Sequence, residues 1–208
     1  MNHVSCRRSA LKSIALALAL AGAVLSAQHA NAESSAATGA TPLSTSARLD
    51  FSIVIPRFLQ FRVGSVGATI DLVTFTVPAA NVGDSSVIAG TGGDLGAGQV
   101  TVTVRANSGQ VTITPTNNSG GTGLANGVAG QFISYSDIAT ASSAAGTLPA
   151  PTLSNAGGTA VTPTLSAGNV TNRAANWTYT YLNTTVPNSG TYGTSVNGGR
   201  VTYTASTP

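Results

Sequence analysis

Residues 99–115, QVTVTVRANSGQVTITP, contain two runs in which apolar and polar residues alternate. Alternation with a period of two is typical of a β-strand that buries one face, and the intervening Asn-Ser-Gly is typical of a turn. The apolar positions are Val100, Val102, Val104 and Ala106 in the first run and Val111, Ile113 and Pro115 in the second. We therefore predict a β-hairpin with one buried face and one threonine-rich face in contact with solvent.

The length of the turn sets the register of this predicted hairpin. A loop of two or four residues places Val104 opposite Ile113 and Ala106 opposite Val111, so that the apolar faces coincide. A three-residue loop would place Val104 opposite Thr112 and would mix the two faces. A sheet with one apolar face needs a second layer to cover it, which favours a two-layer β structure.

Similar alternating segments recur from residue 48 onward, with turn-forming residues between them. Strands are predicted at residues 48–56, 58–63, 68–77, 99–106, 111–115, 132–138, 176–182 and 200–205. Within 68–77 the alternation shifts by one position near Leu72, which predicts a β-bulge. Residues 139–172 are rich in small and polar residues and are predicted mainly as surface loops.

This strand pattern favours an all-β protein. After residue 32 no segment has the 3.6-residue apolar period of an amphipathic helix. We expect residues 48–208 to form a single antiparallel β-sandwich of the Ig-like or Greek-key type, preceded by a cleaved signal-peptide helix. A β-helix is the main alternative because Gly, Asn and Thr are abundant, although no fixed repeat period is present.

The N-terminal region has the layout of an export signal. Residues 1–32 combine a basic start, an apolar run at 14–25 and a small-x-small cleavage site at 30–32. The apolar run is shorter than the roughly 20 residues of a membrane span, which is the competing interpretation. Arg7 and Arg8 also resemble a twin-arginine motif, so both the general secretory and the twin-arginine routes remain open. Residues 33–47 are small and polar and predict a flexible leader.

We therefore expect an exported protein, located in the periplasm, at the cell surface or outside the cell. The sequence offers no cysteine after the cleavage site and no apolar C-terminal tail, so no stable membrane anchor is predicted. The net charge of +3 comes from Arg7, Arg8 and Lys12, and from residue 33 onward six arginines balance six acids. A nucleic-acid partner is not expected, because its electrostatic basis is missing.

The residues after 32 also lack the usual catalytic and metal-binding side chains. The one cysteine, both histidines and the one lysine all precede residue 33. Ser-His-Asp, Cys-His and Ser-Lys devices each need one of these side chains as base or nucleophile. Zinc, copper and iron sites normally use His or Cys ligands. We predict a noncatalytic protein without a cofactor or a catalytic, cofactor-binding or metal site.

Carboxylates are the only remaining groups for catalysis or metal binding. A hydrolase pair of the glycosidase type would have to come from Asp50, Asp71, Asp84, Asp94 and Asp137. Asp84 and Asp94 fall in one predicted loop and could join backbone carbonyls around Ca²⁺, although the spacing of a calcium loop is absent. We expect turn aspartates in contact with solvent, and the question of calcium stays open.

Two groups of side chains suggest possible binding surfaces. Trp177, Tyr179 and Tyr181 share one face of a predicted strand, where an aromatic stripe could stack on sugar rings. Burial in the core is the favoured interpretation, because the chain has few other large side chains to fill it. A second group of four threonines on the predicted hairpin would form a small array of the kind that could bind ice: Thr101, Thr103, Thr112 and Thr114.

The signal, the Ser/Ala-rich leader, the Thr-rich alternating strands and the closing segment together resemble exported bacterial β-sandwich surface proteins. The closing segment runs from Gly190-Thr-Tyr192 to Gly199-Arg200-Val201-Thr-Tyr203-Thr-Ala205. The likeness is to fimbrial subunits and WxL-type domains, but the chain lacks both the WxL tripeptide and the cysteine pair of many pilins. The resemblance implies a structural or adhesive surface component; a carbohydrate-binding module with an aromatic face is the alternative.

We also expect partners that bind by strand addition, either other copies of the chain or other surface proteins, and the aromatic stripe adds a glycan as an alternative partner. Residues 48–55 are the candidate strand for this exchange. They follow the predicted flexible leader, alternate large apolar residues and have no covalent link to the rest of the chain. The alternative is that they form the first strand of their own domain.

Overall fold

The computed structural model describes residues 34–208, so the predicted signal peptide at 1–32 lies outside the described residues. The chain divides into two compact units, and the second, Ile55–Pro208, contains every strand of the described part. Helix is limited there to two single 3₁₀ turns, η1 (Ala79–Asn81) and η2 (Tyr135–Asp137). The predicted all-β, antiparallel fold class is confirmed for these residues.

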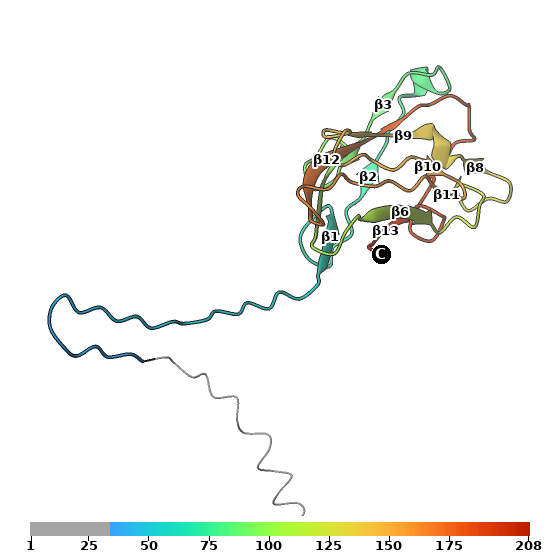
Figure 1. Ribbon diagram of the computed structural model, residues 1–208. Helices are drawn as coiled ribbons and strands as arrows, with labels where there is room; N and C mark the ends of the chain where they lie inside the picture. Colours follow the sequence, from blue (N-terminus) through green and yellow to red (C-terminus); the bar gives the residue numbers. More distant parts are fainter. Residues whose placement is uncertain (1–33) are drawn as a thin grey trace, which may run out of the picture. The chain divides into compact units, whose positions relative to one another are not determined.

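The largest sheet has five strands, all paired antiparallel (Figure 1). At its centre β5 pairs with β1 along one edge and with β12 along the other, so that Val104 lies opposite both Phe61 and Arg173. The C-terminal part of β12 also pairs with β9 and β3. The bounds are β1 (Leu59–Val63), β3 (Ile88–Ala89), β5 (Gln99–Ala106), β9 (Ile138–Ser142) and β12 (Thr171–Tyr181).

A second pair of strands, β6 (Thr112–Asn117) and β13 (Val201–Ser206), forms a separate two-stranded sheet. Its antiparallel register places Ile113 opposite Ala205 and Pro115 opposite Tyr203. Three further two-stranded ladders join short segments in the loops. They are β2 (Val73–Thr74) with β4 (Thr91–Gly92), β7 (Leu124–Ala125) with β8 (Phe132–Ile133), and β10 (Leu153–Ser154) with β11 (Gly157–Gly158).

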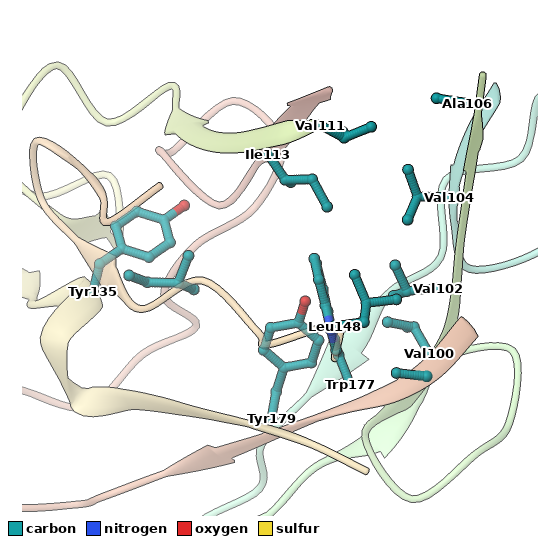
Figure 2. Close-up of a cluster of buried hydrophobic side chains, with 12 residues drawn as sticks. Val100, Val102, Val104, Ala106, Val111, Ile113, Tyr135, Leu148, Trp177 and Tyr179 are labelled. Carbon is teal, nitrogen blue, oxygen red and sulfur yellow. The ribbon is translucent and has the colours of Figure 1, made fainter. Parts of the chain in front are cut away.

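The prediction of a hairpin at 99–115 is wrong about which strands pair and right about which side of each strand is buried. β5 and β6 belong to different sheets, so the turn at 107–110 carries the chain across the core from one sheet to the other. Every apolar position that the alternation placed on the inner side is buried. Figure 2 shows the β5 side chains facing the same interior as Val111 and Ile113. Alternation identifies the apolar face of a strand, but the hydrogen-bonding partner is chosen by the other strands.

The core is built around Trp177, which is fully buried between the two sheets' apolar faces. Its indole meets the ring of Tyr203 edge to face, with 5.3 Å between the ring centroids. Leu148 and Tyr135 complete this core from loop segments (Figure 2). Burying a side chain of this size contributes roughly 1.5–3 kcal/mol, so these few large residues provide much of the cohesion of a core otherwise made of Val and Ala.

Other strand predictions differ from the structure in extent. Residues 139–172, predicted mainly as loops, contain parts of β9 and β12 together with β10 and β11. Of 68–77 only β2 is a strand; Ile70 and Leu72 are exposed, whereas Val73 and Phe75 pack on the core. The change of phase near Leu72 therefore marks where the chain turns inward. Between residues 34 and 208 the structure contains no helix with the length and apolar character of a membrane span.

Candidate assembly segment and sheet edges

The segment 48–55 does not form the half-buried strand that its alternation predicts. It contains no strand, and the side chains that should face a core are exposed: Leu49 by 69%, Phe51 by 86%, Ile53 by 85% and Ile55 by 74%. Within the described residues no strand pairs with this segment. The physical reason for the difference is that a half-buried strand needs a neighbouring strand to pair with and a core to cover, and residues 49–55 pair with no described strand and expose their apolar side chains.

Such exposure is costly for a chain in water. Each of these four apolar side chains would contribute roughly 1.5–3 kcal/mol if it were transferred from water to a packed interior. Contiguous exposed apolar surface on a soluble protein commonly marks an interaction site. Because these apolar residues alternate with others, their side chains would all lie on one face if the segment formed an extended, paired strand. We refer to residues 48–55 as the apolar segment.

The chain is fixed to the domain immediately after the apolar segment. The side chain of Asn107, in the crossover between β5 and β6, donates a hydrogen bond to the Pro56 carbonyl oxygen (2.8 Å) and accepts one from the Phe58 amide (2.9 Å). The Asn107 amide in turn donates to the Phe58 carbonyl oxygen (3.4 Å). These bonds hold the start of β1 in place. This role is not predictable from the sequence, because Asn107 stands in an Asn-Ser-Gly stretch that is typical of an ordinary turn.

Several strands of the described residues end a sheet and pair with one strand only: β1, β3 and β9 in the large sheet and β13 in the small one. β13 pairs with β6 only, through all six of its residues. The residues of β13 that face inward, Val201, Tyr203 and Ala205, are only partly buried. Their partners Ile113 and Pro115 on β6 are fully buried. The core is therefore incompletely covered along the β13 edge.

Tyr203 links this edge strand to the large sheet. Its hydroxyl lies 2.9 Å from the hydroxyl of Tyr179 on β12, and its ring contacts Trp177. Burial raises the pKa of Tyr179 to about 12 and raises the pKa of Tyr203 well above its ordinary value. Both hydroxyls therefore stay protonated at neutral pH and can share one hydrogen bond.

The aromatic stripe considered for sugar stacking is buried. At least nine-tenths of each of its residues, Trp177, Tyr179 and Tyr181, is removed from solvent. They point from β12 into the interior, in the phase that the alternation predicts. Stacking on a sugar requires an exposed ring face. In this structure the three rings are core residues, which accords with the favoured interpretation.

The proposed threonine array is divided between the two sheets. Thr101 and Thr103 lie on β5, whereas Thr112 and Thr114 lie on β6. Because the apolar faces of β5 and β6 both point into the core, their threonine faces point away from each other. Thr114 lies instead opposite Thr204 of β13. A continuous array of the four predicted threonines is therefore not present.

Asp84, one of the two aspartates considered for calcium, is held within its own loop. It is exposed and accepts hydrogen bonds from the Ser86 amide (2.8 Å) and from the side-chain amides of Asn81 (2.7 Å) and Asn183 (3.1 Å). Side-chain hydrogen bonds from Ser86 and Asn81 lower the pKa of this carboxyl. Asp84 therefore serves to fix the turn that follows η1.

Asn183 is a buried residue whose side chain hydrogen-bonds to that turn, and the sequence did not predict this role. It follows the end of β12, is 1% exposed and has a positive φ of 53°. Its side chain accepts from the Gly83 amide (3.0 Å) and donates to the Asn81 carbonyl oxygen (2.6 Å). Asn tolerates this left-handed backbone better than most residues, so the position suits it in both backbone and side chain.

The other predicted carboxylates also hold local structure. Asp94 accepts from the Thr101 amide (2.7 Å), Asp71 from the Ser65 hydroxyl (2.8 Å), and Asp137 from the Thr184 hydroxyl (2.9 Å). Among residues 34–208 no cluster of three or more His, Cys, Asp or Glu side chains is positioned to hold a metal ion. Together with Asp84, these residues are four acids that make four separate local contacts.

Residues 49–55 and the outer edges of β1 and β13 therefore pair with no strand of the described residues. Comparison of this chain with protein-family models, with curated proteins and with solved structures returns no match.

Proposed function

We propose that this protein is an exported, noncatalytic component of a bacterial surface, structural or adhesive, which assembles by donating its apolar segment to another subunit. The observation that carries the proposal is the exposure of Leu49, Phe51, Ile53 and Ile55 on an alternating stretch that pairs with no strand among residues 34–208. Strand addition would provide this stretch with main-chain hydrogen bonds and a surface to cover.

The architecture that suits this role is a single antiparallel β-sandwich of the Ig-like or Greek-key type. Support comes from the two sheets, whose apolar faces share one core, and from the crossover at 107–110 that carries the chain between them. Sandwiches of this kind present unprotected edges unless a neighbour covers them. An assembly of subunits that exchange strands would cover one edge in every copy.

A noncatalytic role is supported by the chemistry of the chain. Residues 33–208 contain no His, Cys or Lys. The described aspartates Asp71, Asp84, Asp94 and Asp137 each accept hydrogen bonds that close or join loops. Export is supported by the signal-like layout of residues 1–32.

The test uses the mature protein, residues 33–208, in sedimentation velocity and electron microscopy. We expect multimers that dissociate when Phe51→Ser and Ile53→Ser are combined, because both side chains lie on the face that would be buried in the partner. Val54→Ser is the matched control, since Val54 is equally exposed (89%) but lies on the opposite face of an extended strand.

Loss of multimers in the double variant with retention in Val54→Ser would support the proposal. A mature protein that remains monomeric at high concentration would overturn it. Equal behaviour of the double variant and Val54→Ser would also overturn it, because nonspecific apolar association does not distinguish the two faces of a strand.

A further inference from the structure

We infer that the acceptor of the apolar segment is the outer edge of β13 in a second copy of this chain. This inference rests on the proposed assembly function and adds to it a defined docking site. Three properties of β13 carry it: an unoccupied edge, a partly uncovered apolar face, and the absence of the residues that usually protect an edge.

The unoccupied edge supplies the hydrogen bonds. β13 is an end strand of a two-stranded sheet, and in the described part of the chain its only ladder is with β6. An end strand presents a row of N–H and C=O groups on its outer side that another extended chain can pair with. The six residues of β13 match in length the seven residues from Leu49 to Ile55.

The apolar faces also match. Val201, Tyr203 and Ala205 lie on the inner side of β13 and are only partly buried. A strand added beside them would place its own alternate side chains on the same side, next to these three residues. Leu49, Phe51, Ile53 and Ile55 provide four apolar side chains at that spacing. The addition would complete the cover over the core beside Trp177.

β13 is a better acceptor than β1, the end strand that contacts it, because of its composition. Natural edge strands are commonly protected by charged residues or proline. β1 carries Arg62 on its outward face, and Arg57 shortly precedes it. β13, VTYTAS, has no charge and no proline, and its outward residues are Thr202, Thr204 and Ser206. β1 and β13 lie close together, so a strand beside β13 would also reach the open side of the large sheet (Figure 1).

The chain suits a disulfide test, because residues 33–208 contain no cysteine. One mature variant carries Ser52→Cys, at the centre of the apolar segment on its polar face. The second carries Thr202→Cys or Thr204→Cys, on the outward face of β13. Opposed residues on neighbouring strands lie at about 4.5–5.5 Å between Cα atoms, within the range that a disulfide can bridge. All three positions are exposed, so the substitutions should leave folding unaffected.

The matched control is Gln60→Cys, which is exposed on the outward face of β1, the end strand that contacts β13. The two proteins are mixed, dissociated, reassembled and oxidised, and the disulfide-linked pair is identified by mass spectrometry. We expect the Ser52→Cys protein to form a mixed dimer with Thr202→Cys or Thr204→Cys and not with Gln60→Cys.

Crosslinking to Gln60→Cys in place of the β13 positions would overturn the acceptor and leave strand donation intact. Multimers that form without a crosslink at either edge would also overturn the acceptor. Absence of multimers in the unmodified mature protein would instead remove the proposed function itself, so the two failures are distinguishable.

Discussion

The hydroxyl of Tyr203, on the edge strand β13, lies 2.9 Å from the hydroxyl of Tyr179, on β12 of the large sheet. This hydrogen bond joins the two sheets through the core, next to the edge-to-face contact of Tyr203 with Trp177. The two strands belong to separate ladders, so their connection depends on side chains and not on main-chain pairing. Tyr203 therefore attaches the edge strand to the core, where Val201 and Ala205 of the same strand also pack.

Tyr203→Phe should destabilise the domain measurably. The substitution removes one hydroxyl and leaves the Tyr179 hydroxyl without the partner it has in the structure. Leaving a buried polar group unsatisfied costs about 1–3 kcal/mol. Urea denaturation of the mature protein measures this change. Tyr192→Phe is the control, because the Tyr192 hydroxyl bonds the Asn188 carbonyl oxygen at the surface, and its loss should cost well under 1 kcal/mol. Equal losses in the two variants would contradict the inter-sheet role.

The buried tyrosines should make the protein unfold in alkali. Burial raises the pKa of Tyr135 and of Tyr179 to about 12, from an unfolded value of 10.0. A raised folded pKa means that the folded state holds its proton more tightly. Stability is then complete below pH 10 and falls as the pH rises toward 12. Circular dichroism and tyrosinate absorbance, recorded through this range, should change together. Tyrosine ionisation without loss of structure would show that these hydroxyls are accessible.

Val104→Asp should prevent folding, whereas Thr103→Asp should be tolerated. Val104 is fully buried and Thr103 lies on the opposite, partly exposed face of β5. An unpaired carboxylate in an apolar core costs several kcal/mol, a large part of the roughly 5–15 kcal/mol that stabilises a whole domain. Thermal unfolding of both variants tests the difference. A comparable drop in both would contradict the assignment of faces.

Asn183→Ala should loosen the turn at residues 81–86. It removes the side chain that hydrogen-bonds to Gly83 and Asn81. It also leaves alanine at a positive φ, which Asn tolerates better. A loss of about 1–3 kcal/mol is expected for the buried hydrogen bonds. Asn183→Gly also lacks the side chain, but glycine adopts a positive φ without strain. Its loss of stability should therefore be smaller than that of Asn183→Ala. Hydrogen exchange at Gly83 reports the turn directly, and unchanged protection in both variants would contradict the role.

The mature protein should begin at Glu33. The prediction follows from the small residues at positions 30 and 32, which are typical of a signal-peptidase site. Intact-mass analysis of the exported protein measures the N-terminus. A mass that includes residues 1–32 would contradict it.

Several features of the fold can be predicted from the sequence because they depend on local pattern. Alternation identified β1, β5, β6 and β13 to within a residue or two, and it placed Val104, Ile113 and Trp177 on inner faces. The half-buried strand that alternation predicted at 48–56 is not formed. Side chains on a strand alternate strictly between faces, so the face on which an apolar residue lies follows from sequence spacing alone.

Other features depended on contacts between distant parts of the chain. Whether β5 pairs with β6 or crosses to another sheet was decided by β1 and β12, which occupy both edges of β5. The buried position of Asn183 depends on a loop about a hundred residues earlier in the chain. Such pairings leave no periodic trace in the sequence, because any extended strand with one apolar face can satisfy several neighbours.

The sequence by itself therefore determined the all-β class, the inner and outer faces of the long strands, and the exclusion of His-, Cys- and Lys-based chemistry after residue 32. Only the tertiary structure decided which strands pair, which edges stay open and that residues 49–55 pair with no strand of the described residues. The reason is that the apolar pattern is a property of each strand, whereas an open edge is a property of the whole sheet. An edge is defined only by the pairing of all the strands in the folded protein.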